Sequence, residues 1–162
     1  MMNVNYRTDV VYGTTRQIEE VAFEESGLVF VGYGVNAPEY EWNDYKVDVK
    51  DKTVVMLIND PGFELKGTEF NGKAMTYYGR WTYKFEEAAR QGAAGVLIIH
   101  ETAPASYPWG VVENGWSGEQ LNLTFADQNL DRSALEGWIT LDLAEQLFAE
   151  MGTSYALSLI HI

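Results

Sequence analysis

The clearest hydrophobic pattern in the chain is a pair of short, uninterrupted apolar runs. One covers residues 53–58 (TVVMLI) and the other covers residues 96–99 (VLII). Runs of this length are typical of strands that are buried on both faces of a sheet. The segment between them is long enough for a crossover connection, so we expect the two strands to be parallel neighbours.

A helical stripe of apolar residues lies between the two runs. Its members recur at positions i, i+4, i+7 and i+8, and they are Trp81, Phe85, Ala88 and Ala89. Gly92 follows the stripe, and glycine readily takes the positive φ that ends a helix. The pattern predicts a helix over residues 82–91, with Thr82 as its N-cap. We expect Trp81 to anchor this helix in the core.

Weaker patterns predict further strands before and after this central region. Residues 28–33 are rich in β-forming side chains, and residues 138–141 form a last apolar run. Residues 10–12 and 21–23 are candidates for short strands. The sheet is therefore expected to contain two central strands with shorter neighbours.

Two local signals mark the ends of elements. Asp142 and Glu145 have the spacing of a helix start, and an apolar face follows up to Gly152, so a helix is expected over residues 143–151. Pro61 and Gly62 occupy the two central positions of an expected type II turn.

Together these elements predict an α+β fold that is rich in β-structure. At 162 residues the chain has the length of one domain, and 46% hydrophobic residues can supply a core. Residues 1–152 are assigned to this domain, with residues 1–26 as a lead-in. The tail over residues 153–162 ends in LSLIHI, a segment without helix-capping or turn-forming residues. We therefore expect this tail to be truncated or artefactual, and we do not count His161 as a ligand.

The charge balance narrows the range of partners. The chain has 11 Lys plus Arg against 24 Asp plus Glu, which gives a net charge of −13. Such a surface repels phosphate backbones and anionic lipid headgroups, so nucleic acid and membranes are disfavoured as partners. There is no cysteine, which excludes disulfides and thiolate chemistry.

Three patterns could carry chemistry, and each has a simpler structural interpretation. His100 and Glu101, with a carboxylate from the loop of Asp44 or Asp60, could form a small hydrolytic site, but a histidine beside a core strand is usually structural. The acidic side chains over residues 37–51 lack the spacing of an EF-hand loop, so a solvated loop is favoured over a calcium site. The G-x-G-x-x-A pattern that begins at Gly32 precedes a proline instead of a helix, which argues against a dinucleotide site.

Aromatic side chains gather in two segments that are expected to be loops. One precedes the central helix, and the other runs over residues 103–120. Tyrosine, tryptophan and arginine dominate interface hot spots, so both segments are candidates for binding a substrate or partner. The candidate binding residues are Tyr77, Tyr78, Arg80, Tyr107, Trp109 and Trp116. Packing against the sheet is the competing interpretation.

The chain resembles the protease-associated (PA) domain found in secreted zinc aminopeptidases of metallopeptidase family 28. The resemblance runs in one order over most of the chain, from about residue 9 to residue 152. The matching segments are 28–34 (LVFVGYG), 42–45 (WNDY), 59–62 (NDPG), 75–89, 100–104 (HETAP), 107–109 (YPW) and 138–140 (WIT).

The resemblance implies a fold and a function. It implies an open β-barrel or sandwich with a parallel βαβ crossover and two flanking helices. It also implies a non-catalytic module of a secreted or periplasmic enzyme, whose partners are the peptidase domain of the same parent chain and the peptide substrate. The two zinc ions of such enzymes belong to the peptidase unit, and no residue of this chain inherits a catalytic or metal-binding role. A free-standing module for peptide or glycan, and a small hydrolase that uses His100 and Glu101, are the alternatives.

Overall fold

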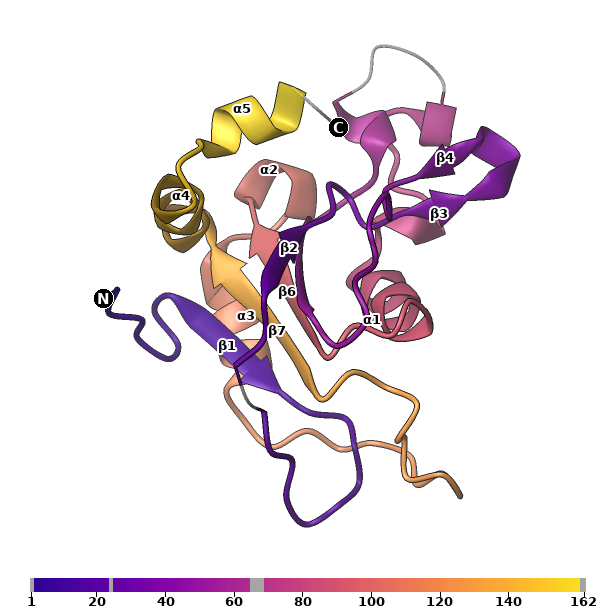
Figure 1. The fold of residues 1–162 in the computed structure, drawn as a ribbon, viewed down its shortest axis with the longest axis vertical. Helices are drawn as coiled ribbons and strands as arrows, with labels where there is room; N and C mark the ends of the chain where they lie inside the picture. The colour runs from indigo at the N-terminus through magenta and orange to yellow at the C-terminus, as the bar shows by residue number, and fades with distance from the viewer. Residues whose placement is uncertain (1, 24, 65–68, 161–162) are drawn as a thin grey trace.

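The protein is described by a computed structural model that covers residues 2–23, 25–64 and 69–160. Its centre is a five-stranded sheet with the strand order β1-β7-β6-β5-β2 (Figure 1). Strand β1 is antiparallel to β7, and all other neighbours are parallel. The strands are β1 (Val10–Gly13), β2 (Leu28–Phe30), β5 (Thr53–Leu57), β6 (Gly95–His100) and β7 (Leu135–Thr140).

Helices lie on both faces of this sheet, which is why its central strands are continuously apolar. Alternate residues of one strand point to opposite faces: Val54 and Met56 belong to one core cluster, whereas Val55 and Leu57 belong to the other. Helices α1 and α3 pack on the first face, and α4 and α5 pack on the second. The helices are α1 (Trp81–Arg90), α2 (Thr102–Ala105), α3 (Trp109–Trp116), α4 (Leu141–Glu150) and α5 (Tyr155–Ile160).

A small ribbon of two antiparallel strands stands beside this sheet (Figure 1). It consists of β3 (Asn36–Ala37) and β4 (Trp42–Asn43), joined through the 3-10 turn η1 (Pro38–Tyr40). Three more 3-10 turns lie between β5 and α1: η2 (Pro61–Phe63), η3 (Glu69–Asn71) and η4 (Tyr77–Gly79). The described helices include none that is both long and apolar enough to cross a membrane.

The structure confirms the α+β class and the central crossover. Strands β5 and β6 are parallel and joined through α1, and the strands expected at 28–33 and 138–141 correspond to β2 and β7. The candidate strand over residues 10–12 is also present, as β1. The barrel or sandwich arrangement is not confirmed, because the described strands of the main sheet follow one linear order that ends at β1 and β2. The described residues form five α-helices, where two were expected.

Several local predictions were wrong. Helix α1 begins one residue early, at Trp81, and its N-cap is the backbone of Arg80 rather than Thr82. Helix α4 begins at Leu141, where the Thr140 hydroxyl accepts a hydrogen bond from the backbone N–H of Leu143. The chain after Asp60 forms the 3-10 turn η2 instead of a type II turn, since its central glycine does not take a positive φ. Residues 21–23 form no strand.

The C-terminal segment belongs to the packed structure as far as Tyr155. This side chain is buried against Phe148 of α4, and its hydroxyl donates a hydrogen bond to Glu101. Whether the segment after residue 152 is truncated or artefactual stays a prediction, and His161 lies outside the described residues.

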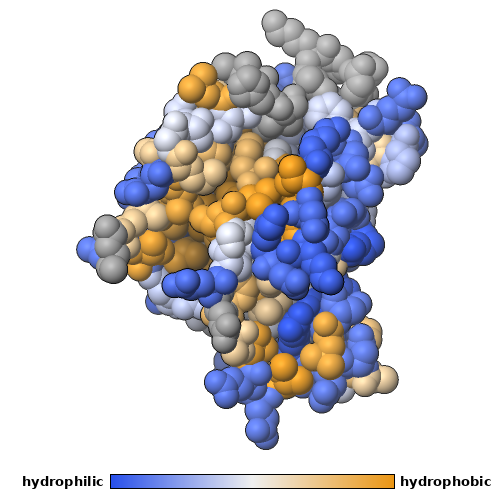
Figure 2. Space-filling model, in the orientation of Figure 1, coloured by the Kyte–Doolittle hydropathy of each residue, from blue (hydrophilic) through white to orange (hydrophobic). Residues whose placement is uncertain are grey.

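The second face of the sheet leaves part of its apolar surface uncovered. Figure 2 shows hydrophobic residues gathered over the part of this view that holds β2 and α4, beside a hydrophilic region. A shallow hollow lies there between Phe30 and Met151. Strand β2 is an edge strand of the sheet, so its outer side has no neighbouring strand in the described residues.

Candidate functional site

The structure places two of the six predicted binding residues in the lining of one pocket and leaves the other four outside it. Tyr77 and Tyr78 lie in η4, where their hydroxyls donate hydrogen bonds to Glu86 and Glu39. The ring of Tyr78 also packs edge-on against Phe70. These contacts support the packing interpretation for Tyr78, whereas Tyr77 is 54% exposed and is held at the surface by its hydrogen bond.

The second aromatic segment is helical, not a loop. Trp109 is the first residue of α3, and its indole N–H donates to the backbone oxygen of Arg7 at 2.9 Å. Trp116 is the last residue of α3, and its ring packs against Trp81, with ring centroids 5.8 Å apart. Tyr107 and Trp116 both line one pocket on the first face of the sheet, whereas the lining of that pocket includes none of Tyr77, Tyr78, Arg80 and Trp109.

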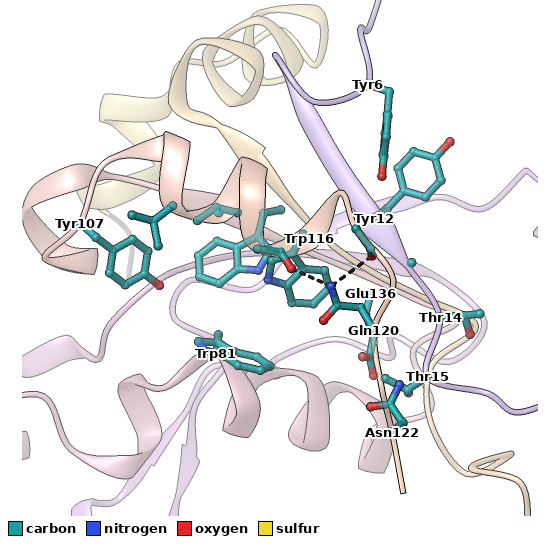
Figure 3. Close-up of a pocket in the computed structure, with 16 residues that line it drawn as sticks. Tyr6, Tyr12, Thr14, Thr15, Trp81, Tyr107, Trp116, Gln120, Asn122 and Glu136 are labelled. Carbon is teal, nitrogen blue, oxygen red and sulfur yellow. Dashed lines mark hydrogen bonds between the residues drawn. The ribbon is translucent and has the colours of Figure 1, made fainter. Parts of the chain in front are cut away.

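This pocket has a volume of about 480 Å³ and lies between α1, α3, β1 and β7 (Figure 3). The segment over residues 118–122 borders it, and the Gln120 side-chain amide in that segment donates hydrogen bonds to the backbone oxygens of Gly115 and Gly118. These bonds tie the border to the end of α3. The volume falls in the range of pockets that hold small ligands, which is about 300–1,000 Å³.

Indole rings form one end of the pocket. Trp116 stands between Trp81 and Trp138, and its ring meets each of them edge to face, at centroid distances of 5.8 Å and 6.4 Å. Trp81 is 42% exposed, which corrects the expectation that it anchors the core. It occupies the first turn of α1 and forms part of the pocket rim, while Phe85 and Ala88 fill the core below it.

A buried acidic group lies at the other end of the pocket, beside Thr15 and Asn122 (Figure 3). Glu136 on β7 is 4% exposed, and burial raises the pKa of its carboxyl to about 7, against smaller opposing effects of Arg132 and Thr15. The Thr15 hydroxyl itself makes no hydrogen bond within the described residues, although it lies near enough to lower that pKa.

Trp138 adds a polar group without a partner. Its side chain is 1% exposed and lines the pocket, and its indole N–H makes no hydrogen bond to any described residue. Buried donors are nearly always satisfied in native proteins, so a group of this kind needs an explanation. Protein atoms cover this N–H almost completely, so a ligand in the pocket does not reach it in this structure.

A second hollow continues from the pocket on the far side of Glu136. Its volume is about 360 Å³, and it shares four lining residues with the pocket: Thr15, Trp81, Asn122 and Glu136. Leu123, Phe125 and Arg132 line its outer part. The two hollows therefore form one trough that passes the carboxyl of Glu136.

The groups of the alternative hydrolytic site are engaged in structural contacts. The Nε2 atom of His100 lies 2.9 Å from the backbone oxygen of Tyr107, and burial lowers the pKa of His100. Glu101 accepts the hydroxyl of Tyr155. Asp60 accepts hydrogen bonds from the backbone N–H groups of Gly62 and Thr76 and from the Thr76 hydroxyl.

Asp44 is held in the same way, by the backbone N–H of Val35 and the indole N–H of Trp42. Within residues 2–23, 25–64 and 69–160, no three His, Cys, Asp or Glu side chains converge to hold a metal ion. The residues described do not fit a zinc site of the kind that aminopeptidases use.

Comparisons of the chain with protein-family profiles, with curated proteins and with solved structures found no match in any of the three. The site is therefore interpreted from its own residues.

Sequence reasoning missed the acidic half of the pocket. Glu136 stands in the segment LEGWIT, directly before a glycine and two residues before Trp138. A charged residue inside an otherwise apolar strand is costly to bury without a partner, so it is a usable signal of a site. The strand predicted from the sequence begins at Trp138, which leaves Glu136 in the preceding loop.

Proposed function

We propose that this chain is a non-catalytic recognition module that binds peptide next to the catalytic unit of a secreted zinc-dependent aminopeptidase, as the PA-domain resemblance implies. The observation that carries the proposal is the pocket between α1 and α3, with its indole walls and buried carboxyl. These are groups that bind and orient a ligand. A binding role is favoured over the hydrolytic alternative because the side chains of that alternative are all held in hydrogen bonds; they are His100, Glu101, Asp44 and Asp60.

The pocket would shape or cover the substrate cleft of the parent enzyme. Aromatic rings supply large contact areas at a low cost in side-chain entropy, and Tyr107 and Trp116 from the original set contribute such rings. The two zinc ions belong to the peptidase unit in this proposal. A glycan-binding module is the second candidate, because indole rings beside the amides of Gln120 and Asn122 also suit a sugar.

An activity and binding assay on the purified chain tests the proposal. With zinc added, we expect no hydrolysis of aminoacyl p-nitroanilides, but a change in tryptophan emission when short peptides are titrated, since three of the five tryptophans line the pocket. Zinc-dependent hydrolysis that is lost in a His100→Ala variant would contradict the proposal. Binding of chitooligosaccharides without binding of peptides would favour the glycan candidate.

A further inference from the structure

The acidic end of the pocket indicates the class of ligand. Glu136 is buried, and within the described residues no Lys, Arg or His lies within ion-pairing distance of its carboxylate. Arg132 is the positively charged residue that lowers the pKa of Glu136, and it lines the adjoining hollow. Its Nε atom lies 3.8 Å from a carboxylate oxygen of Asp131. A buried carboxylate normally needs a cation or several hydrogen bonds to offset its lost hydration.

The aromatic end of the pocket suits the same class of ligand. The rings of Trp81 and Trp116 both line the pocket and stand at 77° to each other. An ammonium or guanidinium group is attracted to the face of an indole ring, and its methylene stem packs on apolar surface. The net charge of −13 also raises the local concentration of cations.

A neutral ligand fits the acidic end of the pocket less well than a cation does. Burial disfavours the charged form of Glu136, and an ammonium or guanidinium group beside the carboxylate would stabilise that form. A neutral sugar brings no charge of this kind.

We propose that the pocket binds a basic side chain of a peptide, the ammonium of lysine or the guanidinium of arginine, with its charge against Glu136 and its stem against Trp81 and Trp116. The adjoining hollow beside Leu123 and Phe125 would hold the neighbouring residues of the peptide. This inference rests on the proposed function, because it names the class of peptide that the module recognises.

Calorimetric titration with two matched peptides tests the inference. The probes are acetyl-glycyl-lysyl-glycinamide and its norleucyl counterpart, which keeps the stem and lacks the charge. We expect the lysyl peptide to bind at least roughly tenfold more tightly. A Glu136→Gln variant should bind both peptides equally, and Trp81→Ala should weaken the lysyl peptide.

Glu145→Gln is the matched control, since Glu145 is an exposed carboxylate on α4, on the opposite face of the sheet. It should leave both affinities unchanged, and the thermal midpoint of every variant checks its folding. The comparison of the two peptides on the unmodified chain does not depend on any variant. Equal binding of the two peptides overturns this inference and leaves the proposed function standing, whereas binding of neither peptide overturns both.

Discussion

Replacing Trp138 by alanine is expected to destabilise the domain by about 3–5 kcal/mol, the range for removing a large aromatic side chain from a packed core. Trp138 lies on β7, is 1% exposed, and contacts both His100 and Trp116. The strands around Trp138 are already in tight contact, so they cannot move far to fill the cavity left by the mutation. At the neighbouring Gly137, an added Cβ would lie only 2.5 Å from the backbone oxygen of Val11. Urea denaturation followed by far-ultraviolet circular dichroism measures the loss.

Trp81→Ala is the matched comparison for this prediction. The sequence alone suggested that Trp81 is a core anchor, but its exposed position on the pocket rim predicts a cost below about 2 kcal/mol. A Trp81→Ala variant that loses as much stability as Trp138→Ala would contradict the structure at this point.

Lys84 is expected to make the stability of the domain depend on pH between about 7 and 9. Its side chain is fully buried on α1, and its ammonium nitrogen donates hydrogen bonds to the backbone oxygens of Tyr33 and Tyr78. Burial lowers the pKa of Lys84 to about 7 from an ordinary value of 10.5, although the charges of Asp44 and Asp60 oppose this shift. At pH values between these two pKa values, the unfolded chain binds a proton that the folded chain does not bind.

The free energy of unfolding should therefore rise with pH in this window, by up to roughly 1.4 kcal/mol per pH unit from this one group. A Lys84→Met variant keeps most of the volume and removes the titration. The difference in unfolding free energy between wild type and variant should grow by on the order of 2 to 3 kcal/mol between pH 7 and pH 9. A difference that stays constant over this range would show that Lys84 is not neutral in the folded chain.

The elements that were predicted correctly are those whose surroundings leave a mark on the local sequence. Apart from Thr53, the runs at 53–58 and 96–99 are apolar at every position because helices cover both faces of the sheet, so the usual alternation of apolar and polar residues is missing. The end of α1 was also predicted correctly, since Gly92 takes the expected positive φ, of 78°.

The errors arose where tertiary contacts override local propensity. Helix α3 contains Gly110, Asn114 and Gly115, which are poor helix formers, so its segment was expected to be a loop. Val112 and Trp116 stabilise it by packing on the first face of the sheet. Strand β1 was no more than a candidate, and its antiparallel pairing with β7 joins residues more than a hundred positions apart, which no local pattern can specify.

The residues of the candidate site were likewise predicted only in part. Tyr107 and Trp116 were identified because aromatic residues near expected loops are candidates for recognition, and both line the pocket. Tyr77 and Tyr78 satisfied the same rule, but their contacts depend on the whole fold. Tyr78 packs against Phe70 of η3 and Tyr40 of η1, and the hydroxyl of Tyr77 donates a hydrogen bond to Glu86 of α1. Glu136 lies in the same pocket as these indole rings because β7 is placed between β1 and β6 in the sheet.

The most direct test of the account is to observe the five indole N–H signals of the protein by nuclear magnetic resonance while the lysyl peptide is added. Three of the tryptophans, Trp81, Trp116 and Trp138, line the pocket, whereas the lining includes neither Trp42 nor Trp109. The account predicts that the signals of these three shift, with the largest change at Trp81, whose exposed ring on the pocket rim would meet the stem of the lysyl side chain. A shift confined to Trp42 or Trp109, or no shift at any indole, would contradict the claim that this pocket is the recognition site.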